Sequence, residues 1–222
     1  MSSKYLRSTI VLGDSNTGKL KFGDGRGTFG HLIPGRRKEV LFIEGIDPLD
    51  CCGYKNIFIH CGINSIKHYA INTSERIDDY FNKFKEKINQ IMLLCPDSKL
   101  FVSPILPTKR EDWNARGRYF NRCLIDFKHA TNNRFTILNF LEYVDTATGM
   151  LCKNMGSYWN PHDPIHLGSS GIRLLIGMVR EHAFGSKVLT NKSFADALVG
   201  PSATGCKKDH GVARPAERGA VS

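Results

Sequence analysis

The stretch that decides the fold is Ser8-Thr9-Ile10-Val11-Leu12-Gly13-Asp14-Ser15-Asn16. Its apolar part is short, continuous and partly β-branched, as in strands that a parallel sheet buries on both faces. Gly13 and Asp14 then favour a turn, because both residue types are common where the chain changes direction. The pattern therefore places the hydroxyl group of Ser15 at the carboxyl end of a buried strand, where open α/β sheets bind their ligands.

Further apolar runs alternate with amphipathic segments along the chain. The runs that predict strands span residues 6–13, 39–44, 56–60, 99–105 and 134–138. The segments that predict helices, from apolar residues spaced three and four apart, span residues 74–95, 113–131 and 168–184. This alternation predicts an α/β fold over residues 1–185, a three-layer α/β/α sandwich with a mainly parallel five-stranded sheet. Residues 186–222 lack periodicity, carry six basic and three acidic side chains, and predict a disordered basic tail.

A second polar motif, Asp163-Pro164-Ile165-His166, precedes the last predicted helix. Together with Ser15 it supplies the residue types of a hydrolytic triad: a serine nucleophile, His166 as general base, and Asp163 to orient the imidazole ring. Each motif alone has a plainer interpretation, since Gly-Asp-Ser occurs in ordinary turns and Asp-Pro begins many loops. The triad hypothesis therefore depends on the fold bringing both motifs to one edge of the sheet.

Acyl transfer also needs hydrogen-bond donors for the oxyanion that forms at the carbonyl carbon. Three candidate donors follow predicted strands: the backbone N–H of Ser15, the backbone N–H of Gly45 and the side-chain amide of Asn64. Gly45 and Asn64 are also ordinary turn residues. Gly30 and Gly35 are alternatives to Gly45 as the second backbone donor.

Four short blocks together carry a resemblance to a known family: Gly13-Asp14-Ser15-Asn16, Glu44-Gly45-Ile46-Asp47, Gly62-Ile63-Asn64-Ser65 and Asp163-Pro164-Ile165-His166. On these residues, and over residues 6–184, the chain resembles the SGNH (GDSL-like) hydrolase superfamily. The resemblance implies a flavodoxin-like sandwich, a catalytic triad of Ser15, Asp163 and His166, and an oxyanion hole of Ser15, Gly45 and Asn64. The sequence departs from the family at Ser65, where the third block usually has aspartate, and the resemblance then implies a weaker structural hydrogen bond.

Within the superfamily, the chain is similar to the esterase-type domains in first-frame proteins of LINE-type retrotransposons and related mobile elements. Such domains resemble acetylhydrolases. The similarity therefore implies a small acyl ester as substrate, and it also raises RNA as a partner.

The composition limits the compartment and the class of protein. The chain has 222 residues, enough for one sizeable core, and a net charge of +10 with a pI near 9.3. Its seven cysteines have no regular spacing, and no apolar segment has the length of a signal peptide or a membrane span. These features favour a thiol-bearing protein of the cytoplasm, with the nucleus as the alternative. No cofactor or metal is implied, because Cys52, His60, Cys61 and His68 lack the spacing of a zinc site.

Much of the positive charge lies in the residues that come shortly after Ser15 in the sequence. Residues 19–38 contain six basic side chains against one acidic side chain, with five glycines and two phenylalanines between them. Such a loop can contact phosphate groups and stack on bases. The residues of this candidate nucleic-acid site are Lys19, Lys21, Arg26, Arg36, Arg37 and Lys38. A second cluster in residues 109–122 has five basic and two acidic side chains, and a solvated surface is the alternative interpretation of both clusters.

Two functions therefore follow from the sequence. The leading hypothesis is a serine esterase that hydrolyses a small acyl ester such as an acetyl ester, without a cofactor. The alternative is a nucleic-acid-binding module of a mobile-element protein, built on an SGNH scaffold with auxiliary or vestigial catalysis. The positive charge also allows peripheral contact with an anionic membrane surface.

Overall fold

The computed structural model describes residues 7–23, 33–68, 74–140, 160, 162–163 and 165–184. Part of the predicted basic loop, residues 24–32, and the predicted tail, residues 186–222, lie outside the described residues. None of the helices in the described ranges is long and apolar enough to cross a membrane.

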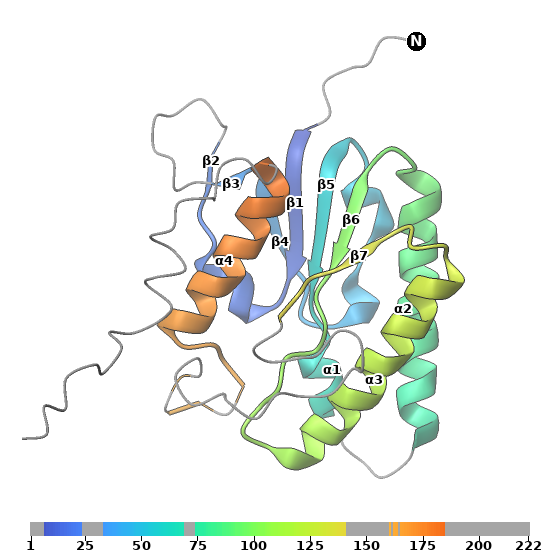
Figure 1. Cartoon of the computed structure of the whole chain (residues 1–222), viewed down its shortest axis with the longest axis vertical. Helices are drawn as coiled ribbons and strands as arrows, with labels where there is room; N and C mark the ends of the chain where they lie inside the picture. The colour runs from blue at the N-terminus through green and yellow to red at the C-terminus, as the bar shows by residue number, and fades with distance from the viewer. Residues whose placement is uncertain are drawn as a thin grey trace, which may run out of the picture. The chain divides into compact units, whose positions relative to one another are not determined.

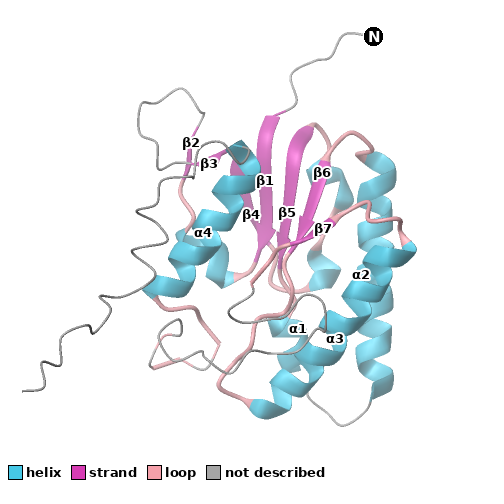
Figure 2. Ribbon diagram, viewed as in Figure 1, coloured by secondary structure: helices cyan, strands magenta, loops and turns pink. Residues whose placement is uncertain are grey.

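A five-stranded sheet forms the centre of the described chain, with the order β4-β1-β5-β6-β7. Its strands are β1 (Arg7–Gly13), β4 (Arg36–Glu39), β5 (Tyr54–His60), β6 (Lys99–Val102) and β7 (Thr136–Ile137). All four pairs of neighbouring strands are parallel, and Figure 2 shows them side by side between helices. The predicted α/β fold with a parallel five-stranded sheet is therefore confirmed.

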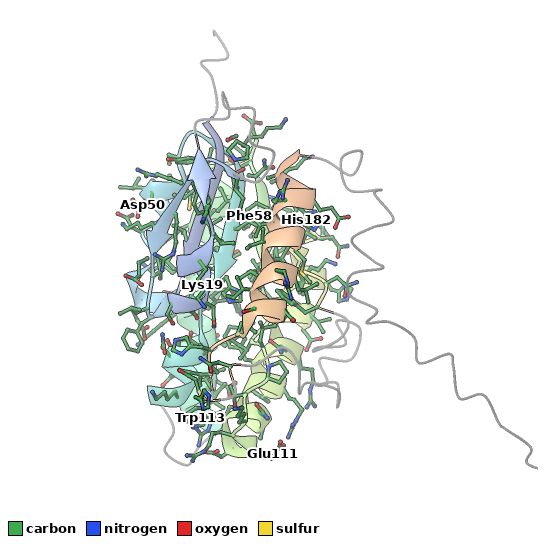
Figure 3. The ribbon with its side chains drawn as sticks, turned by 90° about the vertical axis from the view of Figure 1, so that its left-hand side faces the viewer. Lys19, Asp50, Phe58, Glu111, Trp113 and His182 are labelled. Atoms are coloured by element: carbon green, nitrogen blue, oxygen red, sulfur yellow. The ribbon has the colours of Figure 1, made fainter. Side chains whose placement is uncertain are left out.

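Helices cover both faces of this sheet, as Figure 1 shows. The helices are α1 (Ile63–His68), α2 (Ser74–Leu94), α3 (Glu111–Ala130) and α4 (Ser169–Phe184). Successive residues of a strand point to opposite faces. Ile10 and Leu12 of β1 accordingly pack in the core beneath α2 and α3, while Val11 packs beneath α4. In Figure 3, His182 of α4 lies beside Phe58 of β5, and their ring centroids are 6.5 Å apart.

The position predicted for the second strand, residues 39–44, was wrong. Strand β4 begins at Arg36 and ends at Glu39, and Ile43–Gly45 forms a 3-10 helix, η2. Because β4 lies at the edge of the described sheet, next to β1, it tolerates charged residues on its exposed side. The buried Val40 and Ile43 belong instead to the segment after the strand, which packs them into the core.

Short elements around the sheet were not predicted from the sequence. They are the 3-10 helices η1 (Ser15–Lys19) and η3 (Pro48–Cys51), and a two-stranded sheet of β2 (Phe22–Gly23) and β3 (Ile33–Pro34). Because the five main strands are parallel, their carboxyl ends share one edge, the lower edge in Figure 1, where η1 follows β1 and α1 follows β5. This edge carries the candidate site.

Candidate active site

The turn after β1 presents Ser15 as the first residue of η1. Asp14 is the N-cap of this helix, and its carboxylate accepts a hydrogen bond from the N–H of Asn16 at 2.9 Å. The carbonyl oxygen of Asp14 accepts from the N–H of Thr17 at 3.0 Å. The first N–H groups of a helix have no partner within it, and the Asp14 carboxylate accepts from one of them, while its carbonyl oxygen accepts the first hydrogen bond of the 3-10 helix. The N–H of Ser15 has no hydrogen-bond partner within the described ranges, and Ser15 is exposed.

Ser15, His166 and Asp163 form a continuous chain of hydrogen bonds. The Oγ atom of Ser15 lies 2.7 Å from Nε2 of His166, and Nδ1 of His166 lies 2.5 Å from Oδ2 of Asp163. A carboxylate can only accept, so Nδ1 carries the proton of the neutral ring and Nε2 is left to accept from the serine. The structure thus brings together the three residues predicted as a triad, in the order that a general base needs.

Asp163 is held as a carboxylate by its own turn. Its Oδ1 atom accepts hydrogen bonds from the N–H groups of Ile165 at 2.8 Å and His166 at 3.0 Å. Partial burial acts to raise the pKa of Asp163, but these N–H groups and the His166 ring outweigh it and lower the pKa to about 2. The side chain is therefore ionised at neutral pH, which fixes the orientation of the imidazole ring.

Asn16 joins the two halves of this arrangement. Its Oδ1 atom accepts a buried hydrogen bond of 2.9 Å from the N–H of Leu167, across 151 positions of sequence. Leu167 directly follows His166, so the bond fixes the serine turn against the histidine segment. Asn16 was quoted in the sequence motif without a role, and only the packing of the two segments gives it one.

Asn64, the predicted side-chain donor, lies close to the end of β1. It belongs to α1, which follows β5, and its Nδ2 atom donates to the carbonyl oxygen of Leu41 at 3.3 Å. Leu41 follows β4, and β4 and β5 flank β1 in the sheet. The bond therefore spans the end of the strand that carries Ser15. The amide carries a second N–H group. The neighbouring Ser65 is buried, and its hydroxyl oxygen has no hydrogen-bond partner in the described ranges.

The structure does not bring the predicted backbone donor Gly45 to the site as a donor. Its N–H donates to the carbonyl oxygen of Phe42 at 2.9 Å within η2. The alternative Gly35 donates to the carbonyl oxygen of Gly23 at 3.2 Å, and Gly30 lies outside the described residues. The role of Gly45 stays a prediction that this hydrogen bond disfavours.

A small cavity of about 20 Å³ adjoins the triad. Asp14 and Asn16, which flank Ser15 in sequence, contribute to its wall, and so does Ile165, the neighbour of His166. The rest of the lining is mostly apolar and consists of His60, Cys61, Ile63, Pro104, Ile105 and Leu106. A space of this volume holds one or two groups of the size of water or a methyl group.

A second histidine, His60, lies at the end of β5, and its side chain is buried. It is 6% exposed, and its Nδ1 lies 2.8 Å from the hydroxyl oxygen of Ser103. Burial lowers the pKa of His60 and outweighs the opposing effect of Asp14, so the ring is neutral. The neighbouring Cys61 is buried as well.

The predicted nucleic-acid residues have varied surroundings. Lys19 and Lys21 are exposed, and Arg26 lies outside the described residues. The guanidinium of Arg36 lies 5.3 Å from the ring centroid of Tyr54. Lys38 forms an ion pair with Asp50, and Arg37 turns toward the serine turn, where its Nε atom donates to Oγ1 of Thr17 at 2.7 Å. Part of this charge is thus used within the protein, and nucleic-acid binding stays a prediction.

Two arginines of the second basic cluster, residues 109–122, also form ion pairs within the protein. Nε of Arg110 lies 3.0 Å from Oδ1 of Asp112, and Nη2 of Arg118 lies 2.6 Å from Oε1 of Glu111. Both ion pairs are at the surface near the start of α3. These pairs agree with the interpretation of a solvated surface.

Comparison at the level of sequence finds neither a matching family model nor a matching curated protein. Solved structures do match. A carbohydrate esterase of family 3 from Talaromyces cellulolyticus is similar with a TM-score of 0.54 and 15% identity, over 79% of this chain and 95% of that one. An acetyl esterase mutant with acetate ion has a TM-score of 0.55 and 14% identity, over 79% and 95% of the two chains.

A member of the lipolytic protein G-D-S-L family from Veillonella parvula is also similar, with a TM-score of 0.51 and 14% identity, over 78% of this chain and 96% of that one. At such identities the likeness shows the fold alone. The described domain therefore shares the α/β sandwich of GDSL-type lipases and esterases.

Proposed function

We propose that this protein is a serine esterase that hydrolyses a small acyl ester, of about acetyl size, through Ser15, His166 and Asp163. The observation that carries the proposal is the hydrogen-bond chain from the exposed hydroxyl of Ser15 through His166 to Asp163. A serine in an ordinary turn would not need a histidine from a segment 151 positions away. The neighbours that share the fold include an acetyl esterase and a carbohydrate esterase, which supports the same class of reaction.

The first half of the proposed reaction transfers the acyl group to the enzyme. Oγ of Ser15 attacks the carbonyl carbon while Nε2 of His166 takes the hydroxyl proton, and a tetrahedral intermediate forms. The ionised Asp163 stabilises the imidazolium that results. The intermediate then collapses, the bond to the alcohol oxygen breaks, and His166 returns its proton to the leaving alcohol. An acyl ester on Ser15 remains.

The second half uses water as the nucleophile. His166 takes a proton from the water as its oxygen attacks the acyl carbon, and the same base then protonates Oγ of Ser15 as the acid leaves. In both halves the oxyanion is stabilised by the N–H of Ser15 and by the N–H of the Asn64 amide that does not donate to Leu41. The short acyl group follows from the volume of the adjoining cavity and from its apolar residues Ile63, Ile105 and Ile165.

The test is the hydrolysis of p-nitrophenyl acetate by the purified chain and by the Ser15→Ala variant. We expect turnover by the wild type and a loss of roughly 10⁴-fold or more in kcat for the variant, because the nucleophile is absent. Esters of propionate, butyrate and hexanoate then report the acyl pocket, and kcat/KM is expected to fall with each added methylene group. A folded wild type that hydrolyses no faster than Ser15→Ala would contradict the proposal.

A further inference from the structure

The carbonyl oxygen of Asp14 accepts hydrogen bonds from three donors. Two come from within the turn, the N–H of Thr17 at 3.0 Å and the hydroxyl of Thr17 at 2.7 Å. The third is Nη2 of Arg37 at 3.0 Å, which comes from the neighbouring strand β4. A single N–H donor is enough to close a turn, whereas three donors share the two lone pairs of this carbonyl oxygen.

The same peptide unit carries the N–H of Ser15. In a planar trans peptide the C=O of one residue and the N–H of the next are fixed and point in opposite directions. The donors that hold the Asp14 oxygen inward therefore aim the Ser15 N–H outward, beside its own hydroxyl. A cation on the carbonyl oxygen also polarises the peptide and strengthens its N–H as a donor.

Arg37 is itself oriented for this contact. In the register of the sheet it pairs with Val11 of β1, so its side chain starts within a few residues of the turn. Its Nε atom donates to Oγ1 of Thr17 at 2.7 Å, while Nη2 lies 3.0 Å from a carboxylate oxygen of Glu39. The guanidinium thus spans the Thr17 hydroxyl and the Asp14 carbonyl oxygen, with a longer contact of 3.5 Å to the Gly13 carbonyl oxygen, and the Arg37 side chain is only 21% exposed.

We propose that Arg37 is a positioning residue for the oxyanion: it holds the Asp14–Ser15 peptide so that the Ser15 N–H points at the developing negative charge. The inference rests on the proposed esterase function. It assigns to Arg37 a role within the catalytic turn, where the charge pattern of the sequence indicated only a phosphate contact.

The test compares Arg37→Met and Arg37→Lys with a matched control, Arg173→Met, an exposed arginine on α4. Each variant is assayed for kcat and KM with p-nitrophenyl acetate, and for inhibition by methylboronic acid and by acetate. The boronate forms a tetrahedral adduct with a serine and mimics the oxyanion, whereas acetate reports ground-state binding.

We expect Arg37→Met to lower kcat roughly 10- to 100-fold, because a misaimed oxyanion donor acts on the transition state. The affinity for methylboronic acid is expected to fall by a similar factor, while KM and the acetate inhibition constant change less than about twofold. Arg37→Lys is expected to lie between, because a lysine reaches one acceptor of the turn but cannot span two. Arg173→Met is expected to match the wild type.

Other outcomes overturn the inference. Wild-type values of kcat and boronate affinity in Arg37→Met would exclude the positioning role and leave the esterase function intact. A merely structural role would follow if Arg37→Met lost acetate and boronate affinity equally. It would also follow if kcat changed only in proportion to the folded fraction measured by circular dichroism. If Arg37→Met does not fold, the same comparison is made with Arg37→Lys. A wild type without Ser15-dependent turnover would remove the esterase function, and the inference with it.

Discussion

The two sides of Ser15 are built differently, although both lie at the carboxyl ends of neighbouring strands. On the triad side, Asp14 and Arg37 fix the serine turn, and Asn16 ties it to the histidine segment through a buried bond. On the other side, residues 41–46 follow β4: residues 42–46 close a 3-10 turn on themselves, and Leu41 is 48% and Phe42 40% exposed. The side-chain amide of Asn64, on α1, donates to the carbonyl oxygen of Leu41 in that segment.

This difference indicates how the two sides divide the proposed work. Side chain to backbone hydrogen bonds fix the serine turn on the triad side, where a displacement of 1 Å would cost the proposed reaction about 100-fold in rate. The segment after β4 instead carries exposed apolar surface at Leu41 and Phe42. We therefore propose it as the side on which a substrate group contacts the protein without disturbing the triad. The following variants test that division.

The largest expected effect among them is at Asp163. Asp163→Asn replaces the acceptor of the His166 Nδ1 proton with an amide, which favours the wrong tautomer. We expect kcat for p-nitrophenyl acetate to fall by about 10⁴-fold, with a normal circular dichroism spectrum. Asp79→Asn, an exposed carboxylate on α2, is the matched control and is expected to leave kcat unchanged. Full activity in Asp163→Asn would separate the histidine from its proposed orienting group.

Asn64→Ala tests the connection between the two sides. It removes the proposed side-chain donor to the oxyanion, and we expect kcat to fall by roughly 10²- to 10³-fold with little change in KM. Asn82→Ala, exposed on α2, is the control. A decrease confined to thermal stability would mean that the Asn64 amide serves only the Leu41 carbonyl.

Asn16→Ala tests the bond that holds the triad side together. The variant leaves the buried N–H of Leu167 without its acceptor, which is expected to cost about 1–3 kcal/mol in the free energy of unfolding. A looser histidine segment is also expected to lower kcat by about 10- to 100-fold. Urea titration and steady-state kinetics measure the two effects, with Asn89→Ala on the exposed face of α2 as control. Unchanged kcat in a destabilised variant would mean that the triad does not depend on this bond.

The smallest expected effect is at Gly45. A Cβ atom there would meet only Cγ1 of Val40, at 3.9 Å, and the backbone N–H is already bonded to Phe42. We therefore expect Gly45→Ala to change kcat by less than about twofold. Gly62→Ala provides the contrast, since φ is +131° there and a Cβ atom would lie 2.4 Å from Cδ1 of Ile105. A large loss of kcat in stably folded Gly45→Ala would mean that the substrate approaches the backbone at Gly45 closely, contrary to this expectation.

The fold and the triad partners were accessible from the sequence because their signals are local. The apolar run before Ser15 and the helical stripes predicted the sheet and its covering helices, and the structure confirms them. Asp163 and His166 stand three residues apart, a spacing at which a carboxylate can accept from N–H groups of its own turn. Their meeting with Ser15 is visible in the structure, whereas their catalytic roles remain predictions.

The position of β4 and the contacts of Arg37 and Asn16 could not be predicted from the sequence, because they depend on which segments lie side by side. The apolar residues 40–43 indicated a strand, but an edge strand needs fewer apolar residues than a central one, and β4 forms from the charged residues before them. Arg37 was grouped by charge with its neighbours, and only the register of β4 on β1 places its guanidinium at the serine turn. Asn16 required the contact with Leu167.

The most direct measurement of the central claim is the reaction of the whole chain with a fluorophosphonate probe, followed by peptide mass spectrometry. Such a probe modifies a serine only where a neighbouring base activates its hydroxyl group. We expect a single phosphonylated peptide with the modification on Ser15, and its loss in the folded His166→Ala variant. Absence of an adduct in the wild type, or equal labelling of Ser15 in His166→Ala, would contradict it.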